Sequence, residues 1–372
     1  MKIPVAKPYI GYFEKKFAKE AINEGWISSN GKYIERFENE IKIKLNSKNC
    51  VVCSNGTVAL VMALQALGVG AGDEVIVPDV SFAATINSVI NIGAKPVITE
   101  IDKKTWCIDT KKIIEKITKK TKAIICVHLY GNPCDMGELL KIKKKYNLFL
   151  IEDAAESFGS KFKKKYTGTI GDVGCISFFG NKTISTGEGG CCLTNNNKIY
   201  KKLLLTRNNG IERKKRYFSY FPGLNFKMTN IQAAIGYAQL KKMNKFFNKR
   251  NYIEKKYDNR FKNLINFSRQ KILANHSKVE WLYTILIRNN NINKLIKYLD
   301  KNSIETRRIF YPFHQMPIYK KYVPKKFDKT NSNYIFKYGI SLPTFFELKD
   351  KEINKIINKV IFFQKKSSHL SL

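Results

Sequence analysis

Two hydrophobic patterns alternate along the first two thirds of the chain. Short runs rich in Val and Ile stand between stretches of about 10 to 15 residues whose apolar positions recur at helical spacing. The runs predict strands and the stretches predict helices, so this order indicates βαβ units around a mostly parallel sheet. The predicted strands are 49–55, 73–80, 95–102, 122–131, 149–157 and 174–182. The predicted helices between them are 58–69, 81–93, 109–121 and 136–147.

The pattern changes near residue 245. Residues 249–264 predict a long helix, 279–288 a strand and 292–302 a further helix. This mixture is typical of a smaller α+β unit. We therefore predict a large domain over 1–245 and a small C-terminal domain over 246–372.

Composition narrows the class of protein. No apolar run in the 372 residues is long enough for a membrane span, and the first residues lack the apolar segment of a secretory signal, so we expect a cytoplasmic protein without membrane contact. The net charge of +37 suggests nucleic acid as a partner, but zinc-finger spacing, a recognition helix and an aromatic RNA motif are all missing. We expect the positive field to attract a small anion such as a nucleotide diphosphate. A basic nucleic-acid-binding regulator remains a distant alternative.

The cysteines and histidines do not predict a metal site. Cys50 and Cys53 form a single CxxC within an apolar strand and lack a second ligand pair, so we expect buried structural thiols. The four histidines are scattered along the chain.

Candidate chemistry lies at the ends of predicted strands, where parallel sheets bind ligands. Residues 54–57 (SNGT) lead from a strand into a helix, so backbone N–H groups there could bind an anion, although an ordinary helix cap has the same pattern. No GxGxxG opens a helix, which argues against a dinucleotide-binding dehydrogenase.

An acidic strand end and a lysine follow this turn in the chain. Asp153 ends an apolar strand, where a carboxylate needs a cationic or hydrogen-bonding partner such as a protonated pyridine nitrogen. Lys182 follows Ser177 in a locally apolar stretch, where loss of water would lower the pKa of its amine for Schiff-base chemistry. A phosphate turn, an acidic strand end and Ser-x-x-x-x-Lys, in this order, indicate pyridoxal phosphate (PLP) in an enzyme of fold type I.

The chain also resembles the DegT/DnrJ/EryC1/StrS family of sugar aminotransferases, which use PLP to make amino sugars on nucleotide carriers. The similarity includes SNGTVAL, IEDAAES, SFFGNKTISTGEGG and GLNFKMTNIQAAIGYAQL. The similar segments are 25–38, 54–60, 72–89, 127–136, 151–157, 171–190, 223–240 and 304–319. The resemblance implies an α/β fold of type I, with a mostly parallel seven-stranded sheet flanked by helices and a smaller C-terminal α+β domain.

The resemblance also implies roles around the cofactor. Lys182 would form the Schiff base, and Asp153 would pair with the ring nitrogen and keep it protonated. The remaining cofactor contacts would be Gly56, Thr57 and Ser177 on the phosphate, Phe82 and Ala155 on the ring faces, Glu156 near the 3′-oxygen, and Asn225 reaching a phosphate across a dimer interface. Because Asn225 would reach across the interface, the resemblance implies a homodimer whose two subunits share their active sites.

The expected substrates are L-glutamate and a nucleotide-linked 4-keto-6-deoxy sugar. Because Lys182 is present where a dehydratase branch of the family has His, the resemblance favours amino transfer. A Glu at position 156 resembles the branch of the family that aminates GDP-4-keto-6-deoxymannose, so this sugar is the expected substrate. A dTDP- or UDP-linked 4-keto-6-deoxy sugar is the alternative substrate. The substrate contacts implied by the resemblance are Trp26, Ser28, Ser29, Asn30, Glu188 and, from the partner, His314.

Overall fold

The largest of the three sheets that the structure describes has seven strands. The computed structural model describes residues 2–212, 214, 215, 217–264, 266–288 and 292–369, with no side chains beyond residue 366. The sheet has the order β1-β9-β8-β5-β4-β2-β3. Its strands are β1 (Asn49–Cys53), β2 (Glu74–Pro78), β3 (Lys95–Thr99), β4 (Thr121–Val127), β5 (Phe149–Asp153), β8 (Val173–Ser177) and β9 (Gly190–Thr194). Only β9 runs antiparallel to its neighbours, so the predicted mostly parallel seven-stranded sheet is confirmed.

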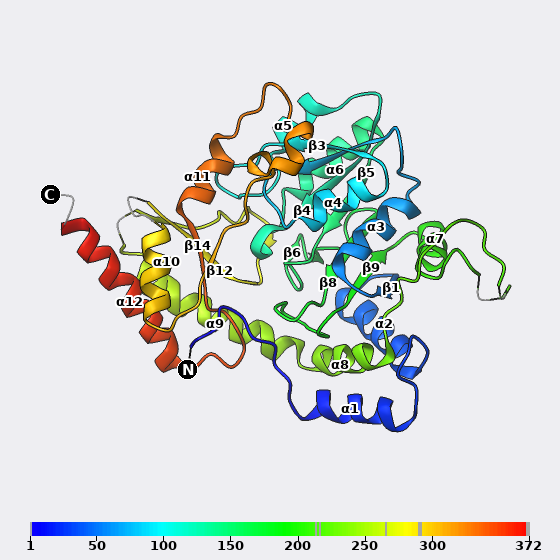
Figure 1. The fold of residues 1–372 in the computed structure, drawn as a ribbon, viewed down its shortest axis with the longest axis horizontal. Helices are drawn as coiled ribbons and strands as arrows, with labels where there is room; N and C mark the ends of the chain where they lie inside the picture. Colours follow the sequence, from blue (N-terminus) through cyan, green and yellow to red (C-terminus); the bar gives the residue numbers. More distant parts are fainter. Residues whose placement is uncertain (1, 213, 216, 265, 289–291, 370–372) are drawn as a thin grey trace.

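Helices cover both faces of this sheet (Figure 1). They are α1 (Tyr12–Asn23), α2 (Lys32–Leu45), α3 (Gly56–Ala66), α4 (Ala84–Asn91), α5 (Thr110–Lys116), α6 (Met136–Tyr146), α7 (Asn197–Arg207) and α8 (Asn230–Lys241). Side chains alternate between the faces along each strand: Ile125 packs with α3, α4 and α7, whereas Ile124 packs with α5 and α6. Helices α2 and α8 cover the second face over β1, β8 and β9, and α1 packs on α8. The result is a three-layer α/β/α arrangement.

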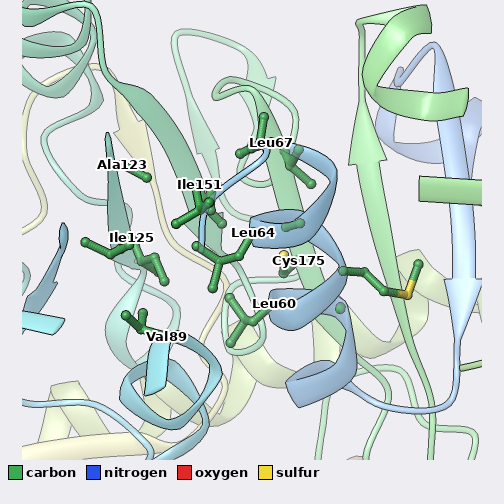
Figure 2. Packing of buried hydrophobic residues seen from close by; sticks show 14 of the residues in the cluster. Leu60, Leu64, Leu67, Val89, Ala123, Ile125, Ile151 and Cys175 are labelled. Carbon is green, nitrogen blue, oxygen red and sulfur yellow. The ribbon is translucent and has the colours of Figure 1, made fainter. Parts of the chain in front are cut away.

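Helix α3 is buried between the sheet and its neighbouring helices. Figure 2 shows Leu60 and Leu64 of α3 in one apolar layer with Val89 of α4 and with Ile125 and Ile151 of the sheet. A helix buried over most of its surface needs few polar positions, which explains its almost continuous apolar sequence, interrupted by the exposed Gln65. Its packing fixes the position of the helix N-terminus directly after β1.

A second, four-stranded antiparallel sheet follows in the C-terminal part, with the order β10-β12-β14-β13. Its strands are β10 (Phe267–Ser268), β12 (Tyr283–Ile287), β13 (Arg307–Arg308) and β14 (Gly339–Leu342). The helices here are α9 (Met243–Phe261), α10 (Ile292–Lys301), α11 (Thr330–Tyr338) and α12 (Asp350–His369), with short 3-10 turns at Phe313–Gln315 and Pro317–Tyr322. Another 3-10 turn, Leu129–Gly131, follows β4 of the large sheet. A small third sheet joins β11 (His276–Ser277), β6 (Lys161–Phe162) and β7 (Lys165–Tyr166). The predicted α+β character of this part is confirmed.

Helix α9 contacts both apolar cores. Phe246 belongs to the cluster under the large sheet, whereas Ile253 and Tyr257 belong to the cluster of the second sheet. The beginning of the chain also reaches the second sheet, because Ile3 pairs with Ile304. The boundary near residue 245 falls within this shared helix and stays a prediction.

All seven strands named from the hydrophobic pattern are present, six of them in the large sheet and one, β12, in the second sheet. Strand β9 was not identified separately, because its five residues follow a glycine-rich turn and contain no Val or Ile. All eight cysteines are free and buried, which confirms the prediction for Cys50 and Cys53. Among the described residues, no helix has both the length and the apolar character needed to cross a membrane.

Gly236 marks a close approach between α8 and α2. A Cβ atom at Gly236 would lie 2.4 Å from Cζ of Phe37, whose ring is fully buried. At Gly137 in α6, by contrast, the nearest neighbours of a Cβ would be 3.4 and 3.7 Å away. Alanine is a better helix former than glycine by about 1 kcal/mol, and this gain applies at both positions. The two positions therefore differ only in how crowded a Cβ atom would be.

We therefore predict opposite effects of the same substitution. Gly236→Ala should lower the free energy of unfolding by about 1–2 kcal/mol, because the clash exceeds the gain in helix propensity. Gly137→Ala, the matched control, should leave it unchanged or raise it by up to about 1 kcal/mol. Urea unfolding of both variants measures this difference. Equal effects of the two substitutions would contradict the proposed packing of α8 on α2.

Candidate active site

The ends of the parallel strands bring the predicted chemistry together. The carboxyl ends of β1, β5 and β8 lie along one edge of the sheet, since both β1 and β8 run antiparallel to β9. Cys53 ends β1 just before the turn into α3, Asp153 ends β5, and Ser177 ends β8. The three segments that the sequence analysis singled out therefore share one edge of the sheet.

Lys182 lies on the turn that follows β8. Its backbone N–H donates to the carbonyl of Phe179 at 2.9 Å, and its Nζ lies 3.9 Å from the centroid of the Trp281 ring. Burial lowers the pKa of its amine, and the nearby carboxyl groups of Glu156 and Asp153 oppose this effect. A neutral form of the amine is therefore easier to reach here than on the surface.

Asp153 is buried and has a hydroxyl partner. Its Oδ2 accepts from Thr85 Oγ1 at 2.8 Å, and Thr85 Oγ1 lies 2.7 Å from Ser81 Oγ. Its Oδ1 accepts only a longer hydrogen bond, 3.3 Å, from the backbone N–H of Ala155. Burial raises the pKa of Asp153, against the effects of Thr85, Ala155 and Lys182. Such a carboxyl group gains most from a cationic N–H donor beside it.

Glu156 is the second buried acid at this edge. Its Oε2 accepts from the backbone N–H of Tyr130 at 2.7 Å. Burial raises the pKa of Glu156 to about 7, although Lys182 and Tyr130 favour the ionised form. Near neutral pH this carboxyl group can therefore either donate or accept a hydrogen bond.

The N-terminus of α3 presents unpaired donors. Asn55 caps the helix by accepting from the Val58 backbone N–H at 2.9 Å, whereas the N–H groups of Gly56 and Thr57 have no hydrogen-bond partner within the described residues. Gly56 also packs against Ser177, because a Cβ on Gly56 would lie 2.8 Å from Ser177 Cβ. Two free N–H groups, a helix dipole and adjacent hydroxyl groups suit a phosphate.

An exposed aromatic ring borders the same edge. Phe82 precedes α4, and 60% of its surface is exposed, with its ring 6.0 Å from that of Phe310. Ala155, beside Asp153, is only partly buried and has a small side chain. A phosphate cradle, a buried acid, a lysine and an uncovered aromatic face together fit a flat, phosphorylated ring such as PLP.

The expected substrate residues lie at several places. Trp26, 53% exposed, and Ser28 belong to a segment that Asn230 holds: its side-chain amide donates to the Trp26 carbonyl at 2.7 Å, and its backbone N–H donates to the Ser28 carbonyl at 2.6 Å. Ser29 and Asn30 line a cleft of about 1110 Å³ between α2, α7 and the loop after α7. Lys182 is not among the residues that line this cleft.

The three other expected contacts differ in exposure. Glu188 is exposed on the turn before β9, and Asn225 is exposed at the base of the loop after α7, which projects from the molecule (Figure 1). His314, however, is nearly buried: its Nδ1 lies 2.6 Å from Asp79 Oδ2 and its Nε2 lies 3.0 Å from Asn333 Oδ1. Both ring nitrogens are therefore engaged within the chain, and the expected contact of His314 with substrate in a partner's site stays a prediction.

Four further residues belong to this site and were not predicted from the sequence: Ser81, Thr85, Tyr130 and Trp281. Thr85 lies three residues after Phe82 within the predicted helix 81–93, and a hydroxyl one helical turn after an expected ring contact is a usable signal. Trp281 was read as part of an apolar strand, and nothing local to its sequence indicates its contact with Lys182.

The chain matches the family model described as the DegT/DnrJ/EryC1/StrS aminotransferase family over residues 8–361. It is 40% identical to GDP-perosamine synthase of Escherichia coli O157:H7 over 359 residues, which cover 96% of this chain and 97% of that protein. It is 32% identical to dTDP-3-amino-3,6-dideoxy-alpha-D-galactopyranose transaminase of Aneurinibacillus thermoaerophilus, with 91% and 92% covered.

A solved structure has the same fold. The chain superposes with a TM-score of 0.92 on Spr1654 from Streptococcus pneumoniae, described as a sugar aminotransferase and solved in its PMP form. The two sequences are 27% identical, and the match covers 100% of both chains.

The pKa of Glu156 predicts a pH-dependent stability of the cofactor-free protein. Between its ordinary value of 4.5 and about 7, the folded protein keeps a proton on Glu156 that the unfolded chain has lost. The free energy of unfolding contributed by Glu156 therefore falls as the pH rises through this window. Glu156→Gln removes the titration, so the variant should gain about 1–3 kcal/mol relative to the wild type between pH 5 and pH 8.

Urea unfolding at several pH values measures this gain. Glu138→Gln, at an exposed carboxylate paired with Lys141 on α6, is the control and should show no comparable trend. The difference in the free energy of unfolding between Glu156→Gln and the wild type should grow as the pH rises. A difference that is constant, or that shrinks, would contradict the raised pKa of Glu156.

Proposed function

Because the chain belongs to the DegT/DnrJ/EryC1/StrS aminotransferase family, we propose that it transfers the amino group of L-glutamate to C4 of a nucleotide-linked 4-keto-6-deoxy sugar. The chain is a PLP-dependent sugar aminotransferase. The observation that supports amino transfer most directly is Lys182, an enclosed amine beside two buried carboxyl groups at the carboxyl edge of the sheet.

We assign the cofactor contacts to the residues at this edge. The N–H groups of Gly56 and Thr57, with the Ser177 hydroxyl, would hold the phosphate. Asp153 would hold the ring nitrogen, because a cationic N–H beside it offsets the cost of burying its charge. The remaining contacts would be Phe82 and Ala155 on the two ring faces, Glu156 at the 3′-oxygen and Asn225 from a partner subunit.

The bound cofactor supplies an electron sink for the carbon that loses or gains a proton. The protein's main contribution to the chemical step is then the movement of protons by Lys182. In its neutral form, Nζ would take the proton from the α-carbon of glutamate, and in the second half of the reaction it would deliver a proton to C4 of the sugar. A positioned acid–base group of this kind contributes about 10²–10⁴-fold in rate.

The protonation state of Lys182 depends on its neighbours. Burial favours the neutral amine, whereas Asp153 and Glu156 favour the ammonium form. The lysine therefore gives up a proton more readily than an exposed lysine does, while the two carboxyl groups keep the ammonium form accessible.

For the sugar, we propose GDP-4-keto-6-deoxymannose, with GDP-perosamine as the product. The 40% identity to GDP-perosamine synthase over 96% of the chain supports this choice. A dTDP-linked 4-keto sugar is the second candidate, supported by the 32% identity to a transaminase named for a dTDP-amino sugar.

We also propose a homodimer with shared active sites. Asn225 and the exposed aromatic residues Phe218, Tyr220 and Phe221 lie on the loop that projects after α7. Exposed apolar side chains on a projecting loop are typical of a surface covered by another subunit. Trp26, Ser28, Ser29, Asn30 and Glu188 would contact the substrate in the completed site.

A panel of sugars tests the proposed substrate. The purified protein with PLP and L-glutamate is incubated with GDP-, dTDP- and UDP-linked 4-keto-6-deoxy sugars, and the products are measured by mass. We predict that kcat/KM is at least about tenfold higher for GDP-4-keto-6-deoxymannose, a difference of about 1.4 kcal/mol in transition-state binding. A preference for a dTDP- or UDP-linked sugar would contradict the choice of nucleotide but not the reaction class.

Lys182→Ala serves as the matched negative control in the panel. It should lose at least about 10²-fold in rate with every sugar, because no amine remains to move the protons. It should still bind the amine form of the cofactor, since the phosphate and ring contacts are unchanged. Lys141→Ala, at an exposed lysine on α6, should transfer amino groups like the wild type. Near-normal rates in Lys182→Ala would overturn the mechanism.

A further inference from the structure

Trp281 connects the second sheet to the lysine of the active site. It stands two residues before β12, is only 3% exposed, and presents its ring face to Nζ of Lys182 at 3.9 Å from the centroid. A lysine ammonium at this distance lies within the range of a cation–π interaction. The contact joins two residues that are far apart in the sequence.

The same indole ring also fixes the backbone beside the lysine. Nε1–H of Trp281 donates to the carbonyl of Asn181 at 2.9 Å. One side chain thus holds both the main chain before Lys182 and the amine at the end of its side chain. A residue that served only to fill the core would need neither the hydrogen bond to Asn181 nor the contact with the Lys182 amine.

The ring itself is held in place by a stack of aromatic side chains. Trp281 stacks on Tyr130 with ring centroids 6.0 Å apart and planes 13° apart, and Tyr130 stacks on Phe310 at 5.5 Å and 9°. The Phe310 backbone N–H donates to Tyr130 Oη at 3.2 Å. The position of the Trp281 ring is therefore supported by two further aromatic rings.

Tyr130 also connects this stack to Glu156. Its φ of 52° lies in the left-handed region, which is unfavourable for a bulky residue and persists only where the surroundings impose it. In this conformation its backbone N–H donates to Glu156 Oε2 at 2.7 Å. The stack thus contacts two of the three ionisable groups that surround the reacting centre.

We propose that Trp281 is a positioning residue for Lys182, through which the second sheet holds the amine in place whenever it is not bonded to the cofactor. This inference rests on the proposed function only in taking Lys182 as the reacting amine. The interaction favours the ammonium form, because the ring face attracts a cation and not a neutral amine. The contact with Trp281 therefore opposes the effect of burial on Lys182, because burial lowers the pKa of the amine and favours its neutral form.

Fluorinated tryptophan tests this role without changing the shape of the side chain. The protein is produced with tryptophan analogues of increasing fluorine content and loaded with the amine form of the cofactor, which leaves the Lys182 amine unbonded. Trinitrobenzenesulfonate then labels Lys182 over a range of pH, and peptide mass spectrometry measures the rate. We expect the midpoint of the labelling rate against pH to move stepwise to lower pH, by about one unit in total, which is a tenfold change in the acid dissociation constant of the amine.

The Trp281→Phe background supplies the matched control. The chain has three tryptophans, and Trp26 and Trp106 have no recorded contact with Lys182 among the described residues. Fluorination should therefore leave the midpoint unchanged in this background. Trp281→Leu, which removes the aromatic face altogether, should move the midpoint at least as far as the most fluorinated analogue.

Three results would overturn the proposal. They are a midpoint that does not respond to fluorination, an equal response in the Trp281→Phe background, or a Trp281→Leu protein that is less stable to heat but labels like the wild type. Each measurement concerns only the amine, so a wrong choice of sugar would not affect it. Conversely, a shifted midpoint would leave the positioning role intact even if the panel of sugars gave no product.

Discussion

The confinement of one amine and two carboxyl groups at one edge of the sheet is the constraint on which the rest of the structure depends. Burial disfavours the charge on all three groups: it lowers the pKa of Lys182 and raises those of Asp153 and Glu156. The attraction between the amine and the two carboxyl groups opposes this effect, so small changes in contact or bound ligand can move a proton. An isolated charge would be too costly in such a place, and a solvated one would have an ordinary pKa.

The fold meets this constraint by the way its strands end. Parallel strands deliver Asp153 and Ser177 to the same edge, and the burial of α3 fixes a helix N-terminus beside them. The loop after β8 then returns Lys182 over this edge, where the second sheet covers it with Trp281. The large sheet thus supplies the acid and the anion site, and the second sheet supplies part of the wall around the amine.

Much of this arrangement could be predicted from the sequence, for physical reasons. Val- and Ile-rich strands between helices define a parallel sheet, and a carboxylate at the end of an apolar strand is costly enough to stand out, as Asp153 does. Lys182 is one of many lysines, and it is distinguished only by its place after the phosphate turn and the acidic strand end and by the resemblance to a family. Thr85 and Trp281 were missed because their partners lie far away in the chain, and hydrophobic patterns carry no information on such pairs.

The most direct test concerns the bond between Lys182 and the cofactor. Borohydride reduction of the PLP-loaded protein, followed by digestion and mass spectrometry, locates the lysine that carries the reduced cofactor. The structure predicts a single label on Lys182 and none on the exposed lysines. A label on a different lysine, or no label at all, would contradict the assignment of the active site.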